Sequence, residues 1–325
     1  MAVVFDKRNT RAWSMAGPSG VLGLASCEIA KENSNFAILT SDLCSYSGLG
    51  RFKKLYPGQL YNVGIAEQNM VAMAAGMASE GMDVFAVTYA AFASARALDQ
   101  VKLCMGYMKQ AVKLAGLSSG FTSGILGATH MCIEDIAIMR AIPDIAIFSP
   151  ADTTETMKVL LTTVNMQQPV YIRICGAQRM PVVFQDDYLF KPGKAVQLKK
   201  GQDVCIMATG PMVVQSLRAA RKLEEDYGIS CTVWDFHTIR PIDKDVIMDS
   251  CKYKLIVTAE EHNTTGGFGS AVSEVLSLCK ERPRQLFIGV DGFYPHAASY
   301  NYLLEQCGLL PEQVAERIKT FLEEN

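Results

Sequence analysis

The sequence predicts an α/β protein with two doubly wound domains, each built on a parallel sheet covered by helices on both faces. Short β-branched and apolar runs alternate with amphipathic stretches along most of the chain, a pattern typical of such sheets. A length of 325 residues suggests about two domains. Apolar side chains make up 49% of the residues, which is enough material for two cores.

The first predicted domain covers residues 1–185. Apolar, β-branched runs predict its strands, and longer segments with apolar residues three and four positions apart predict its helices. We expect strands at 36–40, 83–87, 145–149 and 170–174, and helices at 17–30, 67–80, 91–107, 133–141 and 153–165.

Residues 175–200 interrupt this alternation with Gly176, the pair Pro192-Gly193 and a lysine-rich end. Because glycine and proline clusters mark loops, we interpret this stretch as the link to a smaller second domain, residues 186–325. In that domain we expect strands at 204–208, 231–235, 255–258 and 286–290, and helices at 212–227, 267–279 and 311–322.

Charge and cysteine usage exclude several functional classes. The 31 basic and 33 acidic side chains nearly balance, which gives no electrostatic basis for binding nucleic acid or an anionic membrane. None of the 10 cysteines forms a Cys-x-x-Cys pair, so we expect free thiols in a reducing compartment and no metal site. Residues 1–11 lack the apolar core of a secretory signal, and no apolar run is long enough to span a bilayer. These features predict a soluble, cytoplasmic protein.

A carboxylate stands at the start of an apolar helix. Residues 61–70 predict a short strand, a turn at Gly64 and a helix that begins near Glu67. The helix dipole favours a carboxylate in a first turn, so Glu67 has an ordinary structural explanation. The alternative is a functional carboxylate whose protonation is tuned by apolar surroundings. This segment alone leaves both interpretations open.

Two aromatic residues and a histidine occupy comparable positions. Tyr89 and Phe92 stand three residues apart where a predicted strand turns into a helix. They are either core residues or a stacking wall for a flat heterocycle at the carboxyl end of a parallel sheet, where such ligands bind. His130 ends a glycine-containing loop, residues 120–130, just before a helix. It is placed to face a cleft, but a surface or packed histidine fits equally well.

A second glycine-rich turn lies in the later half of the chain. Residues 258–262 predict a strand end, and Thr-Gly-Gly-Phe-Gly-Ser-Ala-Val follows at 265–272. Amides at a helix N-terminus can bind phosphate, but the spacing matches neither a dinucleotide fingerprint nor a P-loop. We therefore favour close packing as the role of this turn.

Taken in order, these segments resemble the transketolase family. The set comprises Val-Gly-Ile-Ala-Glu-Gln at 63–68, Phe92 with Asp-Gln-Val at 99–101, Thr129-His130, the run 134–143, Ser-Pro-Ala-Asp at 149–152, and Glu261-His262 through Gly269. Each segment is weak alone, but the ordered set is specific and extends to the carboxyl end. The resemblance implies that family's pyrimidine-binding and C-terminal domains, in that order.

The resemblance also implies roles for residues that match the family's motifs. Glu67 matches the glutamate that bonds the pyrimidine nitrogen of thiamine diphosphate and promotes its imino tautomer, so we expect it to be catalytic. Phe92, with Tyr89 as a second candidate, matches the aromatic stack on the pyrimidine ring. Asp42 matches an interface aspartate near the cofactor.

Substrate contacts are implied in the same way. His130 matches a histidine in the substrate channel, where it bonds sugar hydroxyls or a developing oxyanion, and is the second expected catalytic residue. Arg173 resembles the arginine that meets a sugar phosphate.

The chain departs from the family pattern near the expected substrate. Leu126 stands at a substrate-binding position that often carries an acidic residue. A first-helix arginine that often binds phosphate is replaced by Ser14 or Met15, with Arg11 as a possible substitute. Residues 293–299 replace a shorter Gly/Ser-containing segment. These departures favour a substrate outside the usual sugar phosphates.

Complete transketolases bind the cofactor diphosphate and Mg²⁺ through an N-terminal domain with a Gly-Asp-Gly motif. This sequence has no such motif, because Val290-Asp291-Gly292 lacks the first glycine and lies at the wrong end. The resemblance therefore implies the C-terminal subunit of a split transketolase, whose N-terminal partner subunit mainly holds the Mg²⁺ and diphosphate. It also implies self-association within a heterotetramer.

The leading hypothesis is transfer of a two-carbon ketol unit from a ketose to an aldose, active only with the partner. An enzyme like 1-deoxyxylulose-5-phosphate synthase, the beta subunit of a 2-oxo acid dehydrogenase, and a non-catalytic regulatory or scaffolding subunit are the alternatives. The run 134–143 favours transketolase, and Glu67 beside intact aromatic residues argues against a non-catalytic subunit.

Overall fold

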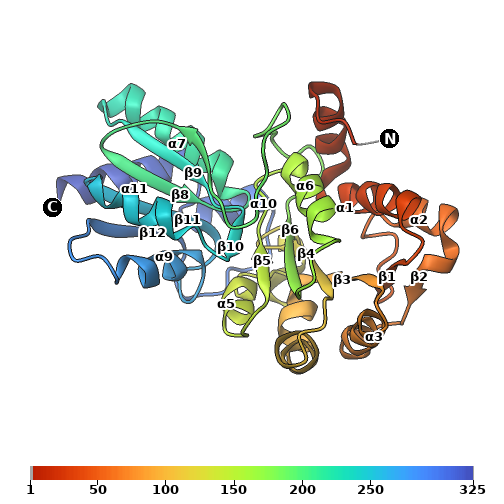
Figure 1. Ribbon diagram of the computed structural model, residues 1–325. Helices are drawn as coiled ribbons and strands as arrows, with labels where there is room; N and C mark the ends of the chain where they lie inside the picture. Colours follow the sequence, from red (N-terminus) through yellow and green to blue (C-terminus); the bar gives the residue numbers. More distant parts are fainter. Residues whose placement is uncertain (1–2, 325) are drawn as a thin grey trace.

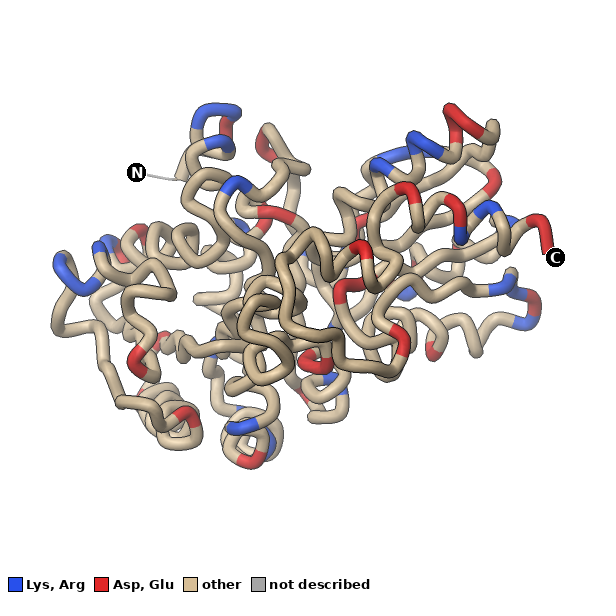
Figure 2. Tube along the Cα trace, turned by 180° about the vertical axis from the view of Figure 1, so that it is seen from behind, with Lys and Arg blue, Asp and Glu red and all other residues tan. Residues whose placement is uncertain are grey.

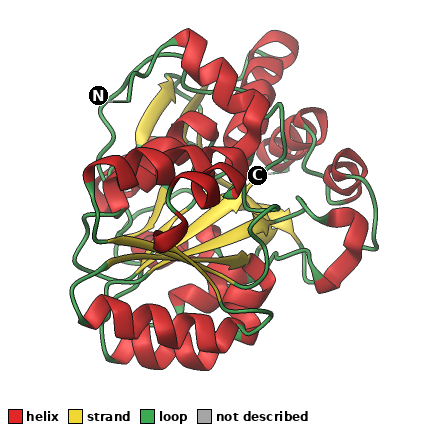
Figure 3. Ribbon diagram, turned by 90° about the vertical axis from the view of Figure 1, so that its right-hand side faces the viewer, coloured by secondary structure: helices red, strands yellow, loops and turns green. Residues whose placement is uncertain are grey.

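The computed structural model describes residues 3–324, which form two α/β lobes side by side (Figure 1). The amino-terminal segment lies on the first lobe, and the chain ends at the far edge of the second lobe. In a view turned by 90°, helices cover both sides of the strands (Figure 3). The predicted class, α/β with two doubly wound units, is confirmed.

The first lobe is built on a seven-stranded sheet of order β10-β5-β6-β4-β3-β1-β2. Its neighbours pair in parallel, except that β10 runs antiparallel to β5. The central strands are buried on both faces, which explains their nearly continuous apolar runs. The strands are β1 (Phe36–Thr40), β2 (Leu60–Asn62), β3 (Asp83–Tyr89), β4 (Lys113–Ser119), β5 (Ala146–Phe148), β6 (Val170–Cys175) and β10 (Thr238–Arg240).

The helices of the first lobe begin at recognisable caps. The Asp6 side chain accepts a bond from the Asn9 amide at 2.8 Å and caps the long first helix, which bends where Gly17 has a φ of 75°. Asp152 caps α6 in the same way. The helical segments are α1 (Lys7–Glu32), α2 (Gly50–Leu55), η1 (Pro57–Gln59), α3 (Glu67–Ser79), η2 (Phe92–Arg96), α4 (Leu98–Gln100), η3 (Val101–Tyr107), η4 (Gly124–Thr129), α5 (Asp135–Arg140) and α6 (Thr153–Thr163).

The second lobe is built on a five-stranded sheet of order β12-β11-β8-β9-β7, in which only β7 is antiparallel to its neighbour. Its longest helix is followed by Gly228, whose φ of 67° is left-handed, as expected of a glycine C-cap. The elements are β7 (Val196–Lys199), β8 (Val204–Ala208), α7 (Met212–Tyr227), β9 (Cys231–Asp235), α8 (Lys244–Asp249), η5 (Ser250–Lys252), β11 (Leu255–Asn263), α9 (Phe268–Leu276), β12 (Arg284–Val290), α10 (Tyr300–Gln306) and α11 (Pro311–Glu323).

Two predictions for the first lobe need correction. Strand β4, in the middle of the sheet, was not predicted, because Lys113 and Gly116 interrupt its apolar run. The single helix expected at 91–107 consists of two π-helical segments, η2 and η3, separated by the short α4. Such π-helical turns occur frequently at functional sites.

The surface carries charge of both signs. Lysine, arginine, aspartate and glutamate are interspersed over both lobes (Figure 2). Among residues 3–324, no helix has the length and apolar character needed to cross a membrane.

Candidate active site

The residues predicted to bind the cofactor gather where β1, β2 and β3 end. These strands are parallel, so their carboxyl ends meet at one edge of the sheet. Asp42 follows β1, Glu67 begins α3 after β2, and Tyr89 is the last residue of β3. This edge is the usual ligand-binding position of a parallel α/β sheet.

Glu67 is buried at this edge, with only 1% of its surface exposed. The turn that precedes it contains Gly64 at a φ of 74°, and α3 then carries an apolar face into the core. Its Oε2 accepts a bond from Nη1 of Arg96 at 3.1 Å. A buried carboxylate is costly unless it is paired, and Arg96 supplies that pairing.

Three rings form a cluster beside Glu67. The centroids of Tyr89 and Phe92 lie 5.8 Å apart, and that of His130 lies 5.6 Å from Tyr89 and 5.4 Å from Phe92. All three pairs meet edge to face, the arrangement that aromatic quadrupoles favour. Burial, aided by Tyr46, raises the pKa of Tyr89. The structure thus brings together Tyr89, Phe92 and His130, although the sequence places His130 far from the other two.

Asp42 reaches the site edge through a different contact. Its φ is 59°, a left-handed conformation uncommon outside glycine. Its backbone amide donates to Oδ1 of Asn62 at 2.9 Å, and Nδ2 of Asn62 donates to its carboxylate at 3.0 Å. The reciprocal pair joins the ends of β1 and β2 and holds the exposed Asp42 carboxylate at the rim.

Leu126 lies in η4, the loop segment that leads to His130, with 50% of its surface exposed. The second lobe supports this loop, because the backbone amide of Ala298 donates to the carbonyl of Gly124 at 3.1 Å. Ala297 also packs closely against Gly127. The unusual segment 293–299 therefore braces the loop that carries Leu126.

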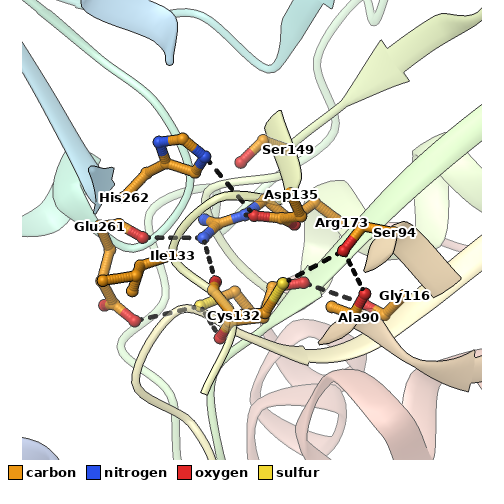
Figure 4. Close-up of polar contacts among 12 residues, drawn as sticks. Ala90, Ser94, Gly116, Cys132, Ile133, Asp135, Ser149, Arg173, Glu261 and His262 are labelled. Atoms are coloured by element: carbon orange, nitrogen blue, oxygen red, sulfur yellow. Dashed lines mark hydrogen bonds and ion pairs between the residues drawn. The ribbon is translucent and has the colours of Figure 1, made fainter. Parts of the chain in front are cut away.

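Arg173 does not occupy the position that the resemblance predicts. Its side chain is fully buried, and its Nε lies 3.1 and 3.0 Å from the two carboxylate oxygens of Asp135. Its Nη2 donates to the carbonyl of Glu261, from the second lobe, at 2.7 Å (Figure 4). A guanidinium held in this way cannot reach a sugar phosphate, so the substrate role expected for Arg173 is wrong. Its contacts instead tie the lobes together.

Two further carboxylates from the second lobe are buried at this junction. Glu261 accepts a bond from the Phe121 amide at 2.7 Å. Glu260 accepts bonds from the amides of Phe268 and Gly269 at 2.6 and 2.8 Å, and burial raises its pKa to about 7. Because a protein carboxylate already takes the amides of the glycine-rich turn, this turn packs the fold and is not open to phosphate.

The chemistry of the site fits one part of thiamine diphosphate. A buried carboxylate beside the half-buried ring of Phe92 offers an acceptor and a stacking face, which an aminopyrimidine requires. Within residues 3–324, no three His, Cys, Asp or Glu side chains gather into a group that could hold a metal ion. The described residues thus offer the contacts that the pyrimidine ring requires.

Sequence reasoning missed two residues of this site. Arg96 follows Phe92 by four positions, a spacing that places side chains near one another on a helix, and this signal could have identified it. Asn62 ends a short exposed strand, and nothing in its neighbourhood distinguishes it from an ordinary turn residue.

Comparisons with known proteins identify the two domains and the family of this chain. Residues 18–177 match the transketolase pyrimidine-binding domain, and residues 193–314 match the transketolase C-terminal domain. The chain is 35% identical over 288 residues to the 6-deoxy-6-sulfo-D-fructose transketolase subunit of Clostridium sp. (strain MSTE9), covering 88% of each chain. It is 38% identical over 252 residues to an apulose-4-phosphate transketolase subunit of Phocaeicola vulgatus, covering 77% of this chain and 80% of that protein.

A solved structure is similar over nearly the whole chain. It is described as a split gene transketolase, inactive beta4 tetramer, and it superposes with a TM-score of 0.86 at 36% identity. The match covers 94% of this chain and 98% of that one. The chain therefore belongs to the transketolase family, whose pyrimidine-binding and C-terminal domains it carries in that order.

Proposed function

We propose that this chain is the C-terminal subunit of a thiamine-diphosphate-dependent transketolase, which transfers a two-carbon ketol unit from a ketose to an aldose. The observation that carries the proposal is Glu67, buried at the start of α3 beside Phe92, Tyr89 and His130. A purely structural ion pair would explain the burial of Glu67. It would not explain why this carboxylate lies next to a half-buried aromatic ring at the edge of the sheet where ligands bind.

When bound, thiamine diphosphate supplies the carbanion equivalent and the electron sink of the transfer. Glu67 would hold a proton at the pyrimidine nitrogen, because its burial keeps water away from the carboxyl group. Phe92 would orient the ring by stacking, with Tyr89 fixing the angle of Phe92 through their edge contact. His130 would donate to a substrate hydroxyl or to a developing oxyanion.

An N-terminal partner subunit is part of the proposal. It would carry the Gly-Asp-Gly motif and hold Mg²⁺ and the diphosphate, while Asp42 would lie near the shared interface. Helix α3, which begins with Glu67, leaves the apolar residues Ala72 and Met73 exposed, and these would be available to a partner subunit. The names of the related subunits support a second kind of subunit, and a neighbour described as a split gene transketolase, inactive beta4 tetramer, supports self-association of this chain. The proposed assembly is a heterotetramer with two copies of each chain.

The proposed substrate is a ketose and aldose pair with a weak requirement for a terminal phosphate. Leu126 cannot bond a sugar hydroxyl, and the relative named for 6-deoxy-6-sulfo-D-fructose indicates that non-phosphate sugars occur among similar proteins. Arg179 is an anion-binding candidate, as is the exposed Arg11. Arg179 is exposed, and its amide donates to the carbonyl of Ser14 at 2.7 Å, beside the first-helix position where the family often has an arginine.

We also propose that the domain boundary lies at 185/186 and that the protein works in the cytoplasm. The boundary falls between the two matched family regions. A reducing compartment is supported by the cysteines, all of which are free thiols.

The test is co-expression with an N-terminal transketolase section from the same organism, followed by a screen of donors and acceptors by mass spectrometry. We expect an aldose to gain two carbons at the expense of a ketose. Release of CO₂ from a 2-oxo acid, without any ketose donor being used, would instead support a synthase or dehydrogenase subunit and contradict the proposal.

A further inference from the structure

Arg96 contacts both groups that the proposed function assigns to the pyrimidine ring. Its Nη1 lies 3.1 Å from Oε2 of Glu67. Its guanidinium carbon also lies 4.0 Å from the centroid of the Phe92 ring. The Arg96 side chain therefore pairs with the Glu67 carboxylate and covers one face of the Phe92 ring at the same time.

A guanidinium can imitate the ring that would replace it. It is planar, donates hydrogen bonds to carboxylates and stacks on aromatic faces. An aminopyrimidine with a proton on its ring nitrogen would make the same pair of contacts. Arg96 and an aminopyrimidine ring therefore cannot both bind at the same time to the Glu67 carboxylate and to this face of Phe92.

The two sides of the ion pair differ in their freedom to move. The side chain of Arg96 is 42% exposed, whereas that of Glu67 is 2% exposed. Arg96 can turn into solvent by giving up its ion pair with Glu67 and its contact with the Phe92 ring, whereas Glu67 is enclosed. Arg96 also ends the π-helical segment η2, in which the Ala97 amide bonds to the Phe92 carbonyl at 3.0 Å, so Phe92 and Arg96 are held within one turn.

We propose that Arg96 is a displaceable placeholder for the cofactor's pyrimidine ring. In the cofactor-free subunit it pairs with Glu67, so that the buried carboxylate is not left alone. Binding of the cofactor displaces it and frees Glu67 to share a proton with the ring. Arg96 is thus a positioning residue that competes with the cofactor. This inference rests on the proposed function.

The competition predicts the size of the effect. A half-exposed ion pair and an exposed cation–π contact each shift an equilibrium by about two- to fivefold. Removing both contacts should therefore tighten cofactor binding by roughly four- to twenty-fivefold. Removing the cation–π contact alone should leave about a two- to fivefold effect.

The experiment measures thiamine diphosphate affinity by isothermal titration calorimetry in the cofactor-depleted complex with the N-terminal section and Mg²⁺. Arg96→Met should bind the cofactor more tightly than wild type, and Lys102→Met, which removes an exposed cation six residues further on, should not. In a Glu67→Gln background the ion pair is already lost. Adding Arg96→Met should then tighten cofactor binding only by the amount expected for the cation–π contact alone.

A second measurement uses the full chain alone, without cofactor. Urea unfolding should show that Arg96→Met lowers stability relative to Lys102→Met, and that Glu67→Gln added to Arg96→Met restores part of the loss. Tight cofactor binding by wild type that Arg96→Met leaves unchanged or weakens would overturn the placeholder role alone. A wild-type complex that binds no thiamine diphosphate would overturn the proposed function and the displacement with it.

Discussion

The carboxylate of Asp135 and the guanidinium of Arg173 form an ion pair with an N–O distance of 3.0 Å in which neither side chain is exposed. Asp135 also accepts a bond from the Tyr171 hydroxyl at 2.8 Å, and Arg173 continues to the Glu261 carbonyl of the second lobe at 2.7 Å. Helix α5 and strands β6 and β11 therefore depend on one buried charge pair.

Arg173→Met should destabilise the chain strongly. The variant leaves Asp135 buried without its partner, and breaking a buried pair in this way costs about 3–5 kcal/mol. Urea unfolding of the full chain measures the change. Lys109→Met is the matched control, because the pair of Lys109 with Asp144 is exposed on both sides. If Arg173→Met is as stable as wild type but selectively loses affinity for phosphorylated sugars, Arg173 is a substrate-binding residue.

Glu67→Gln should abolish most turnover in the assembled enzyme while the fold is retained. Glutamine preserves the shape but cannot share a proton with a ring nitrogen, and such losses cost ~10²–10⁴-fold in rate. Single-turnover kinetics measures the chemical step. Glu80→Gln, at the exposed end of α3, is expected to behave like wild type. A Glu67→Gln enzyme that keeps more than about a tenth of the rate would refute the assigned role.

Substrate preference should respond to residue 126. A charge-assisted hydrogen bond to a sugar contributes about 1.5–3 kcal/mol, or roughly ten- to a hundredfold in specificity. Leu126→Asp should therefore change the discrimination between aldoses that differ in one hydroxyl, whereas Ile125→Asp, next to it and 75% exposed, should not. The comparison uses kcat/KM for matched phosphorylated and unphosphorylated aldoses. A strong phosphate preference in wild type, with no stereochemical response to Leu126→Asp, would indicate an ordinary sugar-phosphate transketolase.

His237 should make stability depend on pH. Burial lowers its pKa from 6.5 to about 4, so the folded state resists protonation that the unfolded state accepts. Its contribution is complete above pH 6.5 and is lost as pH falls through 4. The stability difference between wild type and His237→Gln should therefore shrink by about 2–4 kcal/mol between pH 7 and pH 4.

The control for this pH dependence is the exposed His296. His296→Gln is measured in the same way, by urea unfolding at each pH, so that the loss of a buried and of an exposed histidine can be compared. A difference between wild type and His237→Gln that does not vary with pH would mean that His237 is hydrated in the folded protein.

The local sequence pattern predicted the correct bounds of elements whose structure depends mainly on their own residues. The uninterrupted apolar run of β1 and the amphipathic α7 with Gly228 after it have the bounds that the sequence predicts. Strand β4 was missed, because Lys113 and Gly116 interrupt its apolar run and because its place between β3 and β6 depends on long-range pairing. The joining of β10 to the first sheet is likewise a long-range event.

The residues of the site also differ in whether the local sequence or a long-range contact determines their position. The position of Glu67 after a glycine turn is local, and the sequence predicted a carboxylate at the start of an apolar helix. Arg173 depends on Asp135, 38 residues earlier, and on Glu261, 88 residues later. No local pattern indicates that these charges meet in the interior, and resemblance alone assigned Arg173 to the wrong role.

The most direct test of the account compares the purified chain alone with its complex with an N-terminal transketolase section. Thiamine diphosphate binding and ketol transfer are measured in both samples, in Mg²⁺ buffer and with the same donor and acceptor. The account predicts cofactor binding and turnover in the complex, and neither activity above background in the chain alone, because the proposed partner subunit would hold the diphosphate and Mg²⁺. Robust turnover by the chain alone, or a stable complex that binds no cofactor, would contradict it.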